Sequence, residues 1–283
     1  MQLKGIDISR YQGQPDYAKL ASQVDFVIMQ AGFGRYASQK DAQFERNYAE
    51  CRRNGIPCGA YWFSYAASAD DARTEARACA EVIRGRQFEY PIYYDIEGSA
   101  CSGDVSAKCK AFCSELEKLG WFAGIYISRS PAQTYLDSYC VNNYALWLAE
   151  YGGRLNWAGD VGIWQNSDCG RFDGINGNVD TDICYVDYPE LIKSGGFNGF
   201  EKPQPAEKKP LDVEIWYKRG DKDEPGEHAI FAIKQRLKVL GYSVDDTGGF
   251  GGGTENAVRD LQRIWGYRQT GEIGENFVKK LME

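Results

Sequence analysis

Short apolar runs alternate with longer amphipathic runs over the first 200 residues of the chain. The apolar runs have the length of β-strands, and they fall at residues 3–8, 26–30, 59–63, 92–96, 123–127, 145–149 and 162–165. Helical patterns occupy residues 41–54, 69–84 and 106–119, and each is followed directly by glycine, a common helix stop signal. Repeated strand–helix units predict an α/β fold of parallel strands joined by right-handed crossovers.

The number of strands narrows the fold class. Seven or eight strands over residues 1–200 fit a small (β/α) barrel. A doubly wound open sheet is the alternative that the pattern by itself leaves open.

The pattern changes after residue 200. Residues 201–210 read EKPQPAEKKP, with three prolines and no large apolar side chain, which is typical of an extended linker. Helical spacing then returns at residues 229–240, 254–265 and 275–282. We therefore expect a small all-α three-helix domain at residues 211–283, too small for an ordinary active site and suited to binding.

Composition and charge exclude several classes of partner. The net charge of −7 argues against nucleic acid and anionic lipid as partners. No apolar run approaches the length of a membrane span. The first ten residues do not read as a secretory signal, so we expect synthesis in a host cytoplasm and release to the wall by another route.

The nine cysteines all precede residue 185, and their number is odd. Their spacings do not form the paired knuckles of a zinc site. We expect mostly reduced, buried thiols, no metal and no cofactor.

A single histidine, His228, lies in the C-terminal part of the chain. The first 200 residues therefore cannot form a Ser-His-Asp triad, a Cys-His pair or an H-E-x-x-H zinc site. An enzyme built on this part of the chain would use carboxylates as its acids and bases.

The most informative stretch is PIYYDIEG at residues 91–98. Positions i and i+2 of a strand share one face, so Asp95 and Glu97 would point together into a barrel, at its catalytic end. Two close carboxylates repel each other, so one pKa rises and one group can act as a general acid. A lone D-x-E triplet is a weak signal, because a solvated strand end is its most common meaning.

Two further acids stand near strand ends. Asp7 closes the first apolar run, and Asp180 lies in NGNVDTDICY near the end of the large domain. In a barrel the first and last strands are neighbours, so these two carboxylates would meet at the same mouth. A turn or helix-capping aspartate is the alternative meaning of each.

Several motifs in register carry a family resemblance. They read GIDISRYQG, VDFVIMQAGFG, NGIPCGAYWFS, PIYYDIEG, GIYIS, ALWLAEYG, IWQNSDCG and FDGINGNVDTDICY, in this order over residues 5–185. Together they resemble glycoside hydrolase family 25, the lysozymes of the Chalaropsis type. The resemblance implies an irregular α/β barrel that hydrolyses the β-1,4 bond after N-acetylmuramic acid in peptidoglycan.

The same resemblance implies roles for particular residues. Glu97 would be the general acid, and Asp95 would stabilise the charged intermediate or orient the substrate's acetamido group. Asp7 and Asp180 match the other active-site acids, and four residues match positions that line the sugar groove: Tyr61, Tyr126, Trp147 and Gln165. This chain departs from the family at Gln30, where members often carry lysine.

The tail resembles the peptidoglycan-binding domain of wall hydrolases. Matching positions are Gln235, the Gly249-Phe250-Gly251 loop, Thr254, Ala257-Val258 and Leu261-Gln262. The chain is therefore expected to be an endolysin-type muramidase that acts on bacterial peptidoglycan, and its sequence does not specify an oligomeric state. Two alternatives remain: a non-catalytic wall-binding protein, and a hydrolase specific for chitin or N-acetylglucosamine.

Overall fold

The structure is a computed structural model that describes residues 2–202 and 209–283. The chain divides into two compact units, Met1–Pro203 and Gln204–Glu283. Most of the linker expected at 201–210 falls on residues 203–208, which lie outside the described residues.

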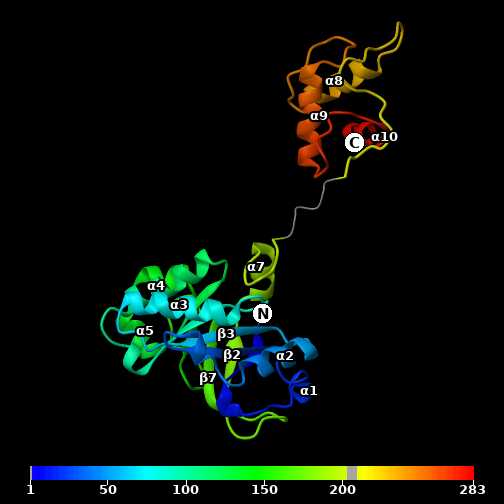
Figure 1. Cartoon of the computed structure of the whole chain (residues 1–283). Coiled ribbons are helices and arrows are strands. Elements are labelled where there is room, and N and C mark those ends of the chain that lie inside the picture. The colour runs from blue at the N-terminus through cyan, green and yellow to red at the C-terminus, as the bar shows by residue number, and fades with distance from the viewer. Residues whose placement is uncertain (1, 203–208) are drawn as a thin grey trace. The chain divides into compact units, whose positions relative to one another are not determined.

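In the described part of the first unit, eight strands close into a barrel in their order along the chain (Figure 1). They are β1 (Leu3–Ile8), β2 (Phe26–Phe33), β3 (Cys58–Phe63), β4 (Ile92–Ile96), β5 (Ala123–Ser128), β6 (Ala145–Ala149), β7 (Ile163–Gly170) and β8 (Val179–Cys184). Closure confirms the irregular (β/α) barrel and excludes the open doubly wound sheet.

The last strand departs from the expected topology. Strands β1 to β7 pair in parallel, whereas β8 runs antiparallel to both β7 and β1. The expectation of parallel strands is therefore wrong for β8. Residues 171–178 join β7 to β8 without a helix, and a parallel return needs a crossover of about a dozen residues or more.

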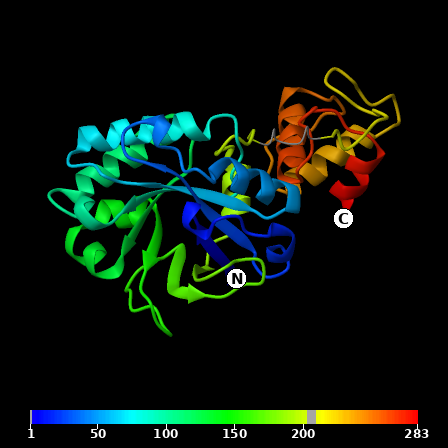
Figure 2. The same ribbon diagram turned by 60° about the horizontal axis from the view of Figure 1, so that its bottom comes forward.

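Helices cover the outside of the barrel (Figure 2). The three expected helices are α2 (Phe44–Asn54), α3 (Ala69–Ile83) and α4 (Val105–Lys118). Four shorter ones were not predicted: α1 (Tyr17–Leu20), α5 (Arg129–Tyr135), α6 (Ser138–Asn143) and α7 (Tyr188–Gly195). Four to eight residues are too few to show a helical period clearly.

Strand alternation divides the barrel side chains into two layers. Ile96 and its outward-facing neighbours pack against the helices in the larger apolar cluster. Phe26, Tyr93, Tyr126 and Trp147 point inward and fill the barrel with rings. The polar residues at the carboxyl ends of the parallel strands pack on this aromatic interior.

The second unit contains α8 (Ala229–Val239), α9 (Gly252–Ile264) and α10 (Glu275–Met282) within the described residues. Their apolar faces meet around Ile233, Val258 and Phe277, all buried. This confirms the small helical domain. No helix in the described ranges is long and apolar enough to cross a membrane.

All nine cysteines lie in the described part of the chain as free thiols, seven of them buried. Cys101 is partly exposed and Cys169 is exposed. Most of the thiols therefore serve as small packing residues.

Candidate active site

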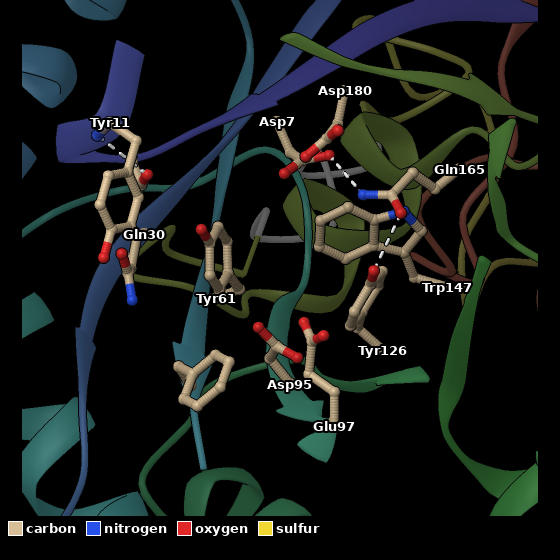
Figure 3. A pocket seen from close by; sticks show the side chains of 12 residues that line it. Asp7, Tyr11, Gln30, Tyr61, Asp95, Glu97, Tyr126, Trp147, Gln165 and Asp180 are labelled. Atoms are coloured by element: carbon tan, nitrogen blue, oxygen red, sulfur yellow. Dashed lines mark hydrogen bonds between the residues drawn. The ribbon is translucent and has the colours of Figure 1, made fainter. Parts of the chain in front are cut away.

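The expected site residues gather around one cleft of about 180 Å³ at the mouth of the barrel (Figure 3). All eight predicted positions line it: Asp7, Tyr61, Asp95, Glu97, Tyr126, Trp147, Gln165 and Asp180. Ser9, Tyr11, Gln30 and Phe63 complete the lining, which contains no lysine or arginine. The cleft is therefore acidic and aromatic.

Asp95 and Glu97 occupy the end of β4 and lie beside each other (Figure 3). Asp95 is the last inward-facing residue of the strand and is buried, whereas Glu97 follows the strand and is exposed. Burial, and then the charge and hydrogen bonding of Glu97, raise the pKa of Asp95 well above its usual range. Burial thus favours the protonated form of Asp95.

The pKa shift of Asp95 adds a detail that the sequence argument left open. Repulsion between the two carboxylates predicts that one pKa rises, but the sequence does not say which. Burial decides it, because the charged form of the deeper group loses more hydration.

Asp7 and Asp180 meet through barrel closure. They are direct partners in the antiparallel ladder of β1 and β8, and they lie side by side in Figure 3. Burial, followed by the charges of Asp182 and Asp180, raises the pKa of Asp7 well above its usual range. Burial and then Asp168 raise the pKa of Asp180 to about 6.

A hydrogen-bond chain orients the Asp7 carboxylate. Gln165 Nε2 donates to Asp7 Oδ2 at 2.8 Å, and the Tyr126 hydroxyl donates to Gln165 Oε1 at 2.9 Å. The amide of Gln165 is therefore fixed by a donor on one side and an acceptor on the other. The chain links β5, β7 and β1 across the cleft (Figure 3).

Trp147 forms the aromatic floor of the cleft. Its ring contacts Tyr126 edge-on, with the ring centroids 4.5 Å apart, and Tyr61 at 6.1 Å. Its Nε1 donates to Asp182 Oδ1 at 2.8 Å. The indole plane is thus held by packing and by one polar contact.

The sequence argument missed Asp182, a polar residue that contacts Trp147, as well as Ser9 and Tyr11 in the lining of the cleft. Asp182 is 1% exposed, and burial raises its pKa to about 8. The signal was present in the VDTD stretch, since Asp182 stands two residues after Asp180 and shares its strand face. The sequence argument placed Asp180 at the last strand but did not extend the alternation to Asp182.

The acids around the cleft do not form a metal site. Across the described ranges, no group of three or more His, Cys, Asp or Glu side chains is arranged to hold a metal ion.

A carboxylate pair and an aromatic cleft at the mouth of a barrel are consistent with a glycoside hydrolase. Comparison with known families identifies which one: residues 6–175 match glycosyl hydrolases family 25, and the chain belongs to this family. Residues 228–281 match a family described as a peptidoglycan binding domain. The protein is therefore a lysozyme-type glycoside hydrolase that carries a wall-binding module.

One known relative matches nearly the whole of this chain, and others match only about two thirds of it. The autolytic lysozyme of Clostridium acetobutylicum is 28% identical over 281 residues, which cover 97% of this chain and 77% of that protein. The structure of the autolysin LytC from Streptococcus pneumoniae with a synthetic peptidoglycan ligand is 27% identical, with a TM-score of 0.60. That match covers 65% of this chain and 47% of LytC, so the chain corresponds to about half of that relative.

The CTP1L endolysin is a further structural neighbour. It is 26% identical, with a TM-score of 0.61, over 68% of this chain and 70% of its own. The neighbours thus include both an autolysin and an endolysin.

Proposed function

We propose that the chain hydrolyses the β-1,4 bond between N-acetylmuramic acid and N-acetylglucosamine in peptidoglycan. In this proposal residues 1–200 form the catalytic domain, residues 201–210 the linker, and residues 211–283 the module that holds the enzyme on the wall. The observation that carries the proposal is the Asp95–Glu97 pair, which shares the cleft with Asp7 and Asp180. Similarity to wall-lytic relatives supports bacterial peptidoglycan as the substrate.

We assign the general acid role to Glu97, the exposed member of the pair. Its carboxyl would protonate the glycosidic oxygen as the bond breaks, and its carboxylate would then take a proton from the attacking water. Burial favours the protonated form of Asp95 in the free protein, so a proton on Asp95 would pass to Glu97 when substrate binds. Asp95 would then be ionised opposite the sugar.

An ionised Asp95 fits a substrate-assisted route. It would accept a hydrogen bond from the acetamido N–H while the acetamido oxygen attacks the anomeric carbon, and water would open the resulting ring with net retention. Tyr61, Tyr126 and Trp147 would pack on the sugar, and Gln165 would orient Asp7. A covalent ester on Asp95 is the competing mechanism.

The decisive experiment compares Glu97→Gln with wild type on purified bacterial walls, following turbidity and new reducing ends. We expect wild type to release muramic acid reducing ends and Glu97→Gln to lose at least about 10²-fold in rate. Glu81→Gln, on the exposed face of α3, is the matched control and should retain full activity. Full activity of Glu97→Gln would contradict the assignment.

The products separate the alternatives. Glucosamine reducing ends would indicate a hydrolase of the chitin type. Pelleting with walls without cleavage by either protein would indicate a binding protein.

A further inference from the structure

One exposed cation stands at the edge of the otherwise acidic cleft. Arg10 lies beside Tyr11, which lines the cleft and is 78% exposed. The guanidinium carbon of Arg10 lies 5.0 Å from the centre of the Tyr11 ring and 5.8 Å from that of Phe33. Arg10 is thus flanked by two aromatic rings at the mouth of the barrel.

The backbone that carries Arg10 is held in place. Ser9 and Gln12 form a capping box around the short 3-10 turn Arg10–Gln12. The backbone N–H of Arg10 donates to Oδ2 of the buried Asp41 at 3.1 Å. The backbone at Arg10 is therefore held by contacts that do not involve the Arg10 side chain.

Most of the guanidinium is available to a ligand. Of its five N–H donors, only one at Nη2 has a partner in the described residues, the Tyr11 hydroxyl at 3.1 Å. No carboxylate within the described residues forms an ion pair with Arg10. The planar guanidinium of arginine can bind the two oxygens of a carboxylate through parallel N–H donors. The guanidinium of Arg10 has no acidic partner in the described residues, and the neighbouring rings pack against it.

We propose that Arg10, with Tyr11 and Phe33, binds a carboxylate of the peptide stem attached to N-acetylmuramic acid. This inference rests on the proposed function, because it names the part of the peptidoglycan that the same cleft recognises beyond the sugars. The acids of the cleft repel a carboxylate from its centre, so the stem is bound at the rim, next to Tyr11. Chitin has no carboxylate, so Arg10 favours peptidoglycan over chitin.

The test uses the full chain and soluble glycan strands in two forms. One form retains its peptide stems; in the other an N-acetylmuramoyl-L-alanine amidase has removed the stems, and the lactyl carboxylate that this hydrolysis frees has been converted to a neutral methylamide. We expect Arg10→Gln to lower kcat/KM on stem-bearing strands by about 3- to 10-fold, as for a solvent-exposed charge-assisted contact. Both proteins should cleave the stripped strands equally, and Arg10→Lys should retain part of the preference.

Arg35→Gln is the matched control, since Arg35 is an exposed arginine paired with Asp71 at 2.9 Å. It should leave the preference for stem-bearing strands unchanged. A second readout is binding of a tetrapeptide muropeptide to the Glu97→Gln protein, which Arg10→Gln should weaken by a similar factor. This readout does not require turnover.

Two results would overturn the inference. One is an unchanged preference in Arg10→Gln, and the other is an equal loss on both forms of the strand, which would mean that Arg10 only supports Tyr11. Failure of the proposed function gives a different result, because wild type would then release no muramic acid ends from either form. In that case both proposals fall together.

Discussion

Replacing Asp182 by asparagine should stabilise the barrel, increasingly so as the pH rises. Asp182 is fully buried, and burial raises its pKa from 3.8 to about 8. Asparagine has nearly the same shape and keeps an oxygen that can accept the bond from Trp147 Nε1. The substitution therefore removes the titration and retains the contact.

The direction follows from linkage. A carboxyl whose pKa is raised on folding gives no penalty below the unfolded pKa, near 4, where it is protonated in both states. As the pH rises towards the folded pKa, the unfolded chain ionises while the folded chain does not, and the folded state loses stability. The window is therefore about pH 4 to 8.

The magnitude follows from the same shift. At pH 7 the unfolded Asp182 is about 3 pH units above its pKa, and each unit is worth about 1.36 kcal/mol, which gives about 4 kcal/mol. The pKa of Asp182 also depends on its interactions with Asp7 from β1 and with Asp180 on its own strand, so this figure is an upper bound. For a domain of this size it corresponds to at most roughly 8–16 °C in Tm.

The assay is calorimetric unfolding of wild type and Asp182→Asn between pH 4 and 8. The two proteins should unfold together near pH 4, and the gap in Tm should widen up to pH 8. Asp180→Asn serves as an internal control, because the pKa of Asp180 is about 6 and its effect should level off above that pH. A gap for Asp182→Asn that is the same at pH 5 and pH 8 would refute the reasoning.

Two other buried charges give further predictions. Lys108 Nζ donates to the carbonyl oxygens of Ala66, Ala100 and Ser102. Lys108→Met should leave these carbonyl groups unpaired, lower the unfolding free energy by about 3 kcal/mol or more, and speed the labelling of Cys101 by a thiol reagent. Unchanged labelling would exclude a role for Lys108 in holding the turn after Glu97. In the second unit, Lys234 Nζ donates to the carbonyl oxygens of Thr247 and Gly249, so Lys234→Met should release the loop that carries them. The variant should pellet less with walls, while its turnover of soluble glycan stays within about twofold of wild type. A matching loss of turnover would contradict separate roles for the two units.

Local pattern determined much of this protein. The periods of 2 and 3.6 are properties of neighbouring residues, so they predicted the strands and helices and limited the fold to a small barrel or a doubly wound sheet. The same alternation placed Asp95 and Glu97 on one strand face. The family resemblance, and not the alternation, added the four groove positions, and all eight predicted positions line one cleft. Their chemical roles remain predictions that the Glu97→Gln experiment addresses first.

The tertiary structure decided what depends on contacts between distant segments. The direction of β8 follows from a short connection and from pairing with β1, and this pairing brings Asp180 opposite Asp7. Burial then raised the pKa of Asp95 and that of Asp182. Desolvation depends on every segment that covers a group, and therefore no local stretch of sequence reveals it.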